Sequence, residues 1–357
     1  MPFGIYFHIP YCLSKCRYCD FYSRPASRQV PEEYVQALLD RLAQFPRDRA
    51  HTVYFGGGTP SLLSPGQLER LIKAADPLDG AEITLEANPE TLTLDLLRDF
   101  RAAGANRLSL GVQTASDQSL RTLGRPHTAR ESRLAFEMAR AAGFDNISGD
   151  IMLALPGYSR AEFDDTLALI KEGGARHISA YLLKIEPGTP FGRRPPAGLP
   201  DEDEAADFYL YAVEQLENAG YRQYEISNFA KPGWQSSHNM IYWNCHDYLG
   251  LGPAAHSCID GVRYAFAPDT AAFIAGAPWE VTGDCTWEDY VMLQLRLRTG
   301  LNLRLLRKKY GIEFSPAKLA FLEKCEKNGF LMLEKDRVRL LPRGLLVENA
   351  ILGELLD

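Results

Sequence analysis

Apolar stretches of strand length alternate with amphipathic stretches of helical period through the first half of the chain. The apolar stretches predict strands over residues 4–9, 52–55, 82–86, 107–112, 146–153 and 177–184. Several of the stretches between them begin at helix-capping residues, such as Ser64 before Pro65 and Ser159 before Glu162. Strands and helices that alternate in this way build a parallel sheet, which is either open or curled into a barrel.

Small or polar residues stand at or near the ends of these predicted strands. They are Gly56, Gly57, Gly58 and Thr59 after the second strand, Glu86 at the end of the third, Gln113 after the fourth and Asp150 within the fifth. The carboxyl ends of parallel strands meet at one edge, and α/β active sites are built there. We therefore expect these residues around the mouth of a barrel.

The second half of the chain follows a different pattern. Prolines and glycines interrupt residues 186–196, and the aromatic-rich segment that ends near His256 follows a predicted helix (203–218) and strand (222–226). Beyond Cys285, three helices and two short strands are typical of a winged-helix-like unit; they are predicted over 287–297, 303–310, 315–328 and within 331–341. The predicted domains are a barrel over 1–195, an extension over 196–282 and a helical, winged-helix-like domain over 283–357.

Composition and charge narrow the class of protein. The 357 residues are 46% hydrophobic and 24% charged, as in ordinary globular proteins, which excludes a disordered, collagen-like or coiled-coil chain. The formal net charge of −7 offers no general attraction for nucleic acid or anionic lipid. No apolar run approaches the roughly 18 residues that span a bilayer, and the first residues lack a secretory signal pattern, so we expect a cytoplasmic protein without a transmembrane segment.

Three of the seven cysteines lie close together in the sequence. Cys12, Cys16 and Cys19 are separated by three and then by two residues. This spacing allows three thiolates to hold three corners of one 4Fe-4S cluster, which leaves the fourth iron open. The alternative is a structural zinc site completed by a distant ligand, but zinc sites usually show paired ligand spacings. The spacing therefore favours an iron-sulfur cluster.

The cysteine motif after the first strand and the glycine turn over residues 56–60 together resemble the radical S-adenosylmethionine (SAM) superfamily. The sequence of residues 6–12, Tyr-Phe-His-Ile-Pro-Tyr-Cys, narrows the resemblance to the branch that is similar to oxygen-independent coproporphyrinogen III oxidase. The resemblance implies an α/β fold with a partial (β/α)6 TIM-like barrel. It also implies that the amino and carboxylate groups of SAM chelate the open iron.

The resemblance further implies which residues contact SAM. They are Tyr6, Gly57, Gly58, Thr59, Glu86, Gln113, Arg125 and Asp150. A glycine turn lets the backbone approach a ligand, Glu86 suits an ammonium group and Arg125 suits a carboxylate, while Gln113 and Asp150 can hydrogen-bond ribose hydroxyls. Taken singly, each residue also has a plain structural interpretation as part of a turn, a strand end, a surface ion pair or a helix cap.

Two features differ from the oxidase itself. Phe21 stands where the oxidase motif carries a further cysteine, and the cluster motif begins at Cys12 with no long extension before it. Both features resemble the HemW group, relatives of the oxidase that act as heme chaperones. This resemblance implies that heme is bound as cargo and delivered to recipient hemoproteins, such as membrane respiratory proteins, and it suggests a homodimer.

A third motif, over residues 238–243, fits the His-Asn-x-x-Tyr-Trp pattern of that group. The heme candidates in and after it are His238, Tyr242, Trp243, Cys245, His246 and His256. Imidazole is a common axial ligand of heme iron, and aromatic rings pack on porphyrin faces. The iron ligand stays open among His238, Cys245, His246 and His256. The plainer interpretation is a folded loop whose aromatic residues belong to the core.

Other functions fit parts of the sequence. The same scaffold supports oxidative decarboxylation of coproporphyrinogen III to protoporphyrinogen IX, or another radical SAM modification of heme. A zinc-stabilised regulator could use a basic stretch of the C-terminal domain on DNA: Arg296, Arg298, Arg304, Arg307, Lys308 and Lys309. The acidic net charge counts against nucleic acid as a partner. The leading hypothesis is a heme chaperone with a 4Fe-4S cluster and SAM.

Overall fold

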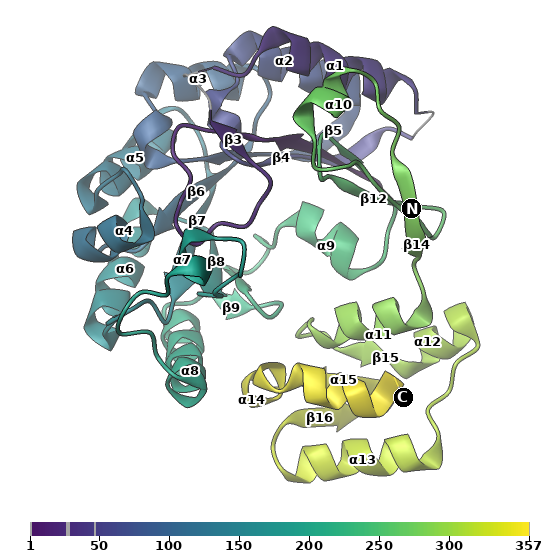
Figure 1. Cartoon of the computed structure of the whole chain (residues 1–357). Helices are drawn as coiled ribbons and strands as arrows, with labels where there is room; N and C mark the ends of the chain where they lie inside the picture. Colours follow the sequence, from purple (N-terminus) through teal and green to yellow (C-terminus); the bar gives the residue numbers. More distant parts are fainter. Residues whose placement is uncertain (1, 26–28, 46–47, 357) are drawn as a thin grey trace.

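The computed structural model describes residues 2–25, 29–45 and 48–356, and its centre is a curved sheet of six parallel strands. In spatial order the six are β1 (Gly4–Ile9), β4 (Ala50–Gly57), β5 (Pro77–Ala87), β6 (Arg107–Gln113), β7 (Asn146–Leu153) and β8 (His177–Leu182). Helices cover the outer face as an arc: α1 (Glu32–Ala43), α2 (Pro65–Ala75), α3 (Leu94–Ala102), α4 (Asp117–Leu123), α5 (Ala129–Ala141) and α6 (Arg160–Gly173) (Figure 1). The predicted partial (β/α)6 barrel is confirmed.

The segment after β8 extends this sheet at both edges. Beside β1, β11 (Tyr248–Leu251) runs parallel, followed by antiparallel β12 (His256–Ile259), β13 (Val262–Ala265) and β14 (Glu280–Asp284). Beside β8 lie β10 (Asn228–Ala230) and β9 (Arg222–Gln223). The helices of this segment are α7 (Pro190–Arg193), α8 (Glu202–Asn218), α9 (Ser237–Trp243) and α10 (Thr270–Ile274). The barrel is therefore an open arc whose two edges belong to one later segment.

Local sequence explains where the barrel helices begin. Ser64 and Gln67 form a capping box at the start of α2, and Ser159 forms another with Glu162 at the start of α6, as predicted. At the start of α1, Pro31 occupies the N-cap position. The core between helices and sheet is apolar, with aromatic side chains stacked across neighbouring strands.

A second hydrophobic core lies in the C-terminal domain. Its helices are α11 (Trp287–Leu295), α12 (Leu303–Tyr310), α13 (Pro316–Lys327), α14 (Pro342–Leu346) and α15 (Glu348–Leu356), and its sheet comprises β15 (Leu301–Asn302), β16 (Leu331–Glu334) and β17 (Arg337–Leu340). The three helices and the hairpin of the predicted winged-helix-like unit are present, whereas β15, α14 and α15 were not predicted. The domain lies next to α9 (Figure 1). The domain boundaries at 195 and 282 stay predictions.

The basic stretch of this domain is largely occupied by internal partners. Arg296 pairs with buried Glu348 at 3.1 Å, and Arg304 pairs with Asp336 at 2.7 Å. Lys309 lies over the ring of Tyr310 at 5.1 Å. The two ion pairs balance part of the positive charge of this stretch, which reduces its attraction for a polyanion. Within the part of the chain that the structure describes, no helix is long and apolar enough to cross a membrane.

Candidate functional site

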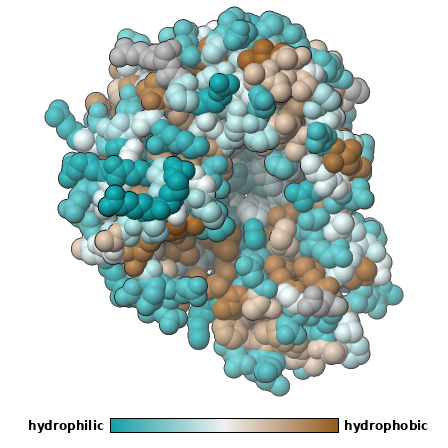
Figure 2. Space-filling view, in the orientation of Figure 1, coloured by the Kyte–Doolittle hydropathy of each residue, from teal (hydrophilic) through white to brown (hydrophobic). Residues whose placement is uncertain are grey.

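The predicted cluster cysteines meet at the mouth of the barrel. Cys12 ends the short strand β2 (Tyr11–Cys12), Cys16 and Cys19 follow in the loop before β3 (Arg24–Pro25), and all three line a cavity of about 420 Å³. Figure 2 shows that this face of the molecule is hollowed near its centre. The cavity begins at the carboxyl ends of the parallel strands and continues inward to Asn239 of α9.

The donor set at the mouth fits a metal cluster. Burial raises the pKa of Cys19 to about 11 and also raises the pKa of Cys12. Such thiols keep their protons at neutral pH unless a cation replaces them, as cluster iron would. Hydrogen bonds to sulfur are already in place, because Thr59 Oγ1 donates to Cys12 Sγ at 3.6 Å and Arg125 Nη1 donates to Cys16 Sγ at 3.4 Å.

The glycine turn after β4 packs directly beneath the cluster loop. Gly57 has φ +110°, and a Cβ there would lie 2.5 Å from the His8 ring. At Gly58 a Cβ would lie 2.7 Å from the carbonyl oxygen of Tyr11, while the Gly58 N–H donates to Ile9 O at 2.9 Å. Only glycine fits these two positions, so the turn keeps its backbone exposed along the cavity wall.

Glu86 supplies a carboxyl group to the cavity at the end of β5. Tyr54 Oη donates to Glu86 Oε1 at 2.7 Å, and the Gly57 N–H donates to Oε2 at 3.2 Å. Burial raises the pKa of Glu86 to about 7, and the nearby charge of Asp150 adds to this effect. A bound ammonium group would stabilise the ionised form, so the site suits an amino group as ligand.

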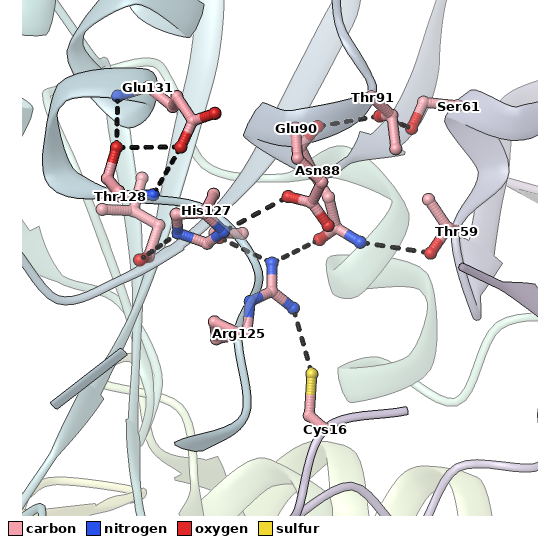
Figure 3. A network of polar contacts seen from close by, with 12 residues as sticks. Cys16, Thr59, Ser61, Asn88, Glu90, Thr91, Arg125, His127, Thr128 and Glu131 are labelled. Carbon is pink, nitrogen blue, oxygen red and sulfur yellow. Dashed lines mark hydrogen bonds and ion pairs between the residues drawn. The ribbon is translucent and has the colours of Figure 1, made fainter. Parts of the chain in front are cut away.

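Arg125 links the cluster loop to β6 and to the segment after β5 (Figure 3). Besides the bond from Nη1 to Cys16, its Nη2 donates to Asn88 Oδ1 at 2.6 Å and to Gly111 O at 3.0 Å. Its buried Nε has no hydrogen-bond partner among the residues that the structure describes. Asn88 in turn donates to Thr59 Oγ1 at 3.1 Å. The guanidinium is thus held at the cavity wall with one donor nitrogen unused.

A buried contact between His127 and Glu90 supports this wall (Figure 3). His127 Nδ1 lies 3.2 Å from Glu90 Oε2, and its Nε2 lies 3.2 Å from Val112 O. Burial tends to raise the pKa of Glu90, but the hydrogen bond from His127 and the charge of Arg125 outweigh it, so the pKa is below its usual value. Glu90 is therefore ionised and holds Arg125 by charge.

The remaining predicted SAM residues occupy different places. Asp150 accepts hydrogen bonds from Ser109 at 2.9 and 3.0 Å, and Gln113 has φ +64° at a register shift between β6 and β7, a bulge of the kind often found beside active sites. Both line the cavity. Tyr6 is not among the lining residues, because its hydroxyl shares a 3.0 Å hydrogen bond with His8 Nδ1. The structure thus brings together every predicted SAM residue except Tyr6.

Sequence reasoning missed several residues of the cavity wall. They are Tyr54, Asn88, Arg107, Ser109, Ser179 and Asn239. Arg107 and Ser109 alternate along β6, and polar residues in a buried parallel strand are a signal that could have identified them. Asn88, directly after β5, also matched the pattern of polar residues at strand ends. No local signal pointed to Asn239 as part of the wall.

His238 lies at the opposite end of the barrel from the cysteines. It is 1% exposed and its Nδ1 shares a 2.7 Å hydrogen bond with Thr52 Oγ1, near the start of β4. Its Nε2 shares another 2.7 Å bond with Tyr242 Oη, and its ring stacks on Tyr54 at 5.0 Å. Burial lowers the pKa of His238 to about 3, so the ring is neutral. Both ring nitrogens are occupied within the protein.

The start of α9 is anchored to the same end of the barrel. Glu82 of β5 accepts hydrogen bonds at 3.0 Å from the backbone N–H groups of Ser237 and His238. A carboxylate in this place accepts hydrogen bonds from N–H groups that have no partner within the helix, and it interacts favourably with the positive end of the helix dipole. The helix that carries the motif, α9 (Ser237–Trp243), therefore lies at the amino ends of the strands, and we call it the plug.

The other heme candidates are spread over the surface between barrel and C-terminal domain. Trp243 O accepts from Gln294 of α11 at 2.8 Å, while the buried Trp243 Nε1 has no partner. Cys245 lies in thiol contact with Cys285, which raises the Cys245 pKa. Among the hydrogen bonds of the described residues, none uses the rings of His246 or His256. His246 follows α9, whereas His256 is exposed on β12, so the structure does not gather the six candidates into one site.

Comparisons with known proteins agree with this architecture. The radical SAM superfamily profile matches residues 6–170, and the HemN C-terminal domain profile matches residues 282–347. The heme chaperone HemW of Bacillus subtilis is 34% identical over 98% of this chain and 98% of its own length. HemW of Escherichia coli is 43% identical over 71% of this chain and 70% of its own length.

A solved structure shares the fold. Coproporphyrinogen III oxidase (HemN) from Escherichia coli, a radical SAM enzyme, superposes with a TM-score of 0.83 at 22% identity, covering 99% of this chain and 90% of that one. At this identity the likeness concerns the arrangement of helices and strands. It includes the C-terminal domain as well as the barrel.

Proposed function

This chain belongs to the HemW heme chaperone family within the radical SAM superfamily, and we propose that it holds a 4Fe-4S cluster and SAM at the barrel mouth and carries heme to recipient hemoproteins. The observation that carries the proposal is the similarity to HemW over nearly the full length of both chains. Membrane respiratory proteins are the recipients that we expect, and a homodimer is the assembly that we expect.

The three thiols of Cys12, Cys16 and Cys19 would hold the cluster. When bound, the cluster supplies an open iron for the amino and carboxylate groups of SAM and a source of single electrons. The hydrogen bonds from Thr59 and Arg125 to two of the sulfurs stabilise thiolate charge, and such donors tune the potential of an iron-sulfur site.

The residues around the thiols would bind the methionine part of SAM. Glu86 accepts the ammonium group and gives up its proton when it does so, since its pKa of about 7 falls beside a cation. The backbone of Gly57 and Gly58 borders the same space, and the guanidinium of Arg125, which also lines it, offers positive charge to a carboxylate. Gln113 and Asp150 face the ribose.

Heme would be held by the segment that follows α9. His246 is the iron ligand that we propose first, because its ring is half-buried and has no hydrogen-bond partner among the described residues. His238 would act indirectly by holding Tyr242 and the helix in place, since both of its ring nitrogens are engaged. Cys245 and His256 are the alternative ligands to be tested beside it.

The decisive experiment separates heme carriage from enzymatic conversion. The anaerobically reconstituted protein is incubated with SAM, a reductant and coproporphyrinogen III, beside an active coproporphyrinogen dehydrogenase as control, and products are followed by mass spectrometry. We expect no decarboxylated product, because exposed Phe21 replaces a cysteine at the cavity rim. Multiple-turnover formation of protoporphyrinogen IX would overturn the proposal.

A second experiment measures carriage directly. The protein is loaded with heme, freed of excess, and mixed with an apo-hemoprotein whose Soret band differs from that of the loaded protein. We expect heme to pass unaltered to the acceptor. A tetrapyrrole of altered mass would instead indicate a heme-modifying enzyme, and failure to bind heme at all would reject both alternatives.

A further inference from the structure

Three other cysteines meet where the extension joins the C-terminal domain. Cys245 follows α9, Cys258 lies in β12, and Cys285 lies between β14 and α11. The thiols of Cys245 and Cys258 both lie close enough to Cys285 to lower its pKa, and Cys245 packs against the hydrophobic core of the C-terminal domain. All three are free, and none belongs to the cluster motif.

Main-chain pairing explains why these thiols meet. Tyr248, at the start of β11, pairs with Cys258 of β12, which brings the connection after α9 alongside that strand. The Cys285 N–H donates to the carbonyl oxygen of Gly261, in the turn that follows β12, at 2.6 Å. Backbone hydrogen bonds therefore fix the strand that carries Cys258 and the position of Cys285.

The surroundings are those of reactive thiols. Cys245 and Cys285 are half-buried, whereas Cys258 is buried. The positive charges of Lys309 and Arg263 act on Cys285. Reactive cysteines are typically found in such partly exposed, electropositive places, and intracellular disulfides are usually transient and redox-sensing.

We propose that Cys285 and Cys245 form a reversible disulfide that ties α9 to α11, with a low-molecular-weight disulfide such as oxidised glutathione as the oxidant. The Cys285 sulfur attacks one sulfur of the oxidant, which breaks the oxidant's disulfide and releases one glutathione. The Cys245 sulfur then attacks the Cys285 sulfur, breaks the mixed disulfide and releases the second glutathione. Two electrons pass from the cysteines to the oxidant, and the two thiol protons end on the two glutathione molecules.

The bond would act on the contact between the two domains. Cys285 immediately precedes Thr286, the N-cap of α11, and Cys245 stands two residues beyond Trp243, the end of α9. Near the other end of α11, Gln294 already donates to Trp243 O at 2.8 Å. A covalent link at the edge of this contact would hold the first helix of the C-terminal domain against the plug of the barrel.

The test uses the full chain with its cluster reconstituted under anaerobic conditions. The protein is equilibrated with oxidised and reduced glutathione at graded ratios, free thiols are alkylated, and linked peptides are identified by mass spectrometry. We expect a peptide pair that joins Cys245 to Cys285, rises with the share of oxidised glutathione and disappears on full reduction. The absence of this pair at the most oxidising ratio, or a dominant Cys258–Cys285 or Cys245–Cys258 pair, would overturn the proposal.

Variants sharpen the assignment. Cys285→Ser should abolish the linked pair and leave Cys245 open to alkylation, whereas Cys258→Ser and the matched control Cys325→Ser, in α13, should retain it. Unchanged cluster absorbance verifies the fold of each variant. If Cys285→Ser does not fold, the linked peptides found in the wild-type protein alone decide whether Cys245 and Cys285 form the disulfide. Amide hydrogen exchange should become slower in α9 and α11 on oxidation but not in α13. Equal exchange rates in α9 and α11 before and after oxidation would refute the proposed link between these helices. None of these measurements requires heme, so they stand apart from the proposed carriage of heme.

Discussion

The mouth of the barrel and the plug at its other end are both rich in polar side chains, but their key polar groups differ in how far internal partners satisfy them. At the mouth, Cys19 and Glu86 have raised pKa values, and Arg125 keeps a buried nitrogen without a partner. At the plug, His238 uses both ring nitrogens, and Glu82 satisfies the start of the helix. A buried polar group without a partner destabilises the protein, whereas a bonded one supports it.

This difference separates two kinds of motif. The cysteine and glycine motifs form a region whose charges and hydrogen bonds are incomplete until a ligand is present. In the histidine motif, the His238 ring and the start of the helix are satisfied without a ligand, and the Trp243 indole nitrogen is the group left without a partner among the described residues. Substitutions at the mouth should therefore weaken ligand binding and preserve the fold. Substitutions at the plug should lower stability and preserve ligand binding.

The largest effect is expected from replacing Cys12, Cys16 and Cys19 with alanine. Loss of three thiolate ligands should abolish the 4Fe-4S absorbance after anaerobic reconstitution, because no other cysteine among the described residues lines the cavity. Iron and acid-labile sulfide should fall to background in the same sample. Cys325→Ala, distant from the mouth, serves as control and should retain the full signal; a cluster that survives the triple substitution would refute the assignment.

The next effect concerns Glu86. Glu86→Gln removes the charge that we expect to meet the SAM ammonium group and should weaken SAM binding by about ten- to a hundredfold, the value of a charge-assisted hydrogen bond. Isothermal titration calorimetry on the reconstituted protein measures the affinity for SAM. The ligand-free variant should be more stable than wild type above pH 7, since it no longer buries a carboxylate.

The same carboxyl group should give SAM binding a pH dependence. Binding requires ionised Glu86, whose pKa is about 7 in the free protein, so affinity should be constant above that pH. Below it, affinity should fall by about tenfold per pH unit, because a proton must first leave. Glu86→Gln should make SAM affinity independent of pH between about pH 5 and 7, the range over which burial has raised the Glu86 pKa. An equally steep profile in the variant would assign the titration to another group.

The two regions also differ in how far the sequence could predict them. The mouth was predictable because parallel strands bring their carboxyl ends together, so that Gly57, Glu86 and Asp150 needed no knowledge of side-chain packing. The spacing of His238 and Tyr242 likewise places them on one helical face. The partner of His238 on the barrel, Thr52, lies 186 residues earlier, and nothing local in the sequence indicates that contact. Tertiary packing alone decides whether such a histidine is free.

At the plug, His238→Ala should act on stability more than on heme. The change leaves the hydroxyls of Thr52 and Tyr242 without their partner and opens a cavity, which should lower the free energy of unfolding by about 2–4 kcal/mol. Denaturant titration measures this loss. The Soret band per folded molecule should be unchanged, while His246→Ala should shift it. The opposite pattern, a shifted band with His238→Ala alone, would make His238 the iron ligand and break the distinction between the two regions.

The smallest effect tests one hydrogen bond of the plug. Thr52→Val keeps the shape of the side chain but removes the hydroxyl that bonds His238 Nδ1 at 2.7 Å, which leaves a buried ring nitrogen unsatisfied. We expect a loss of about 1–2 kcal/mol in the free energy of unfolding, with cluster absorbance and SAM affinity as in wild type. The loss should shrink in the His238→Ala background, because the partner is already gone. Additive losses in the double variant would show that the Thr52 hydroxyl stabilises the barrel by another route, and the plug would then depend less on its histidine than its geometry indicates.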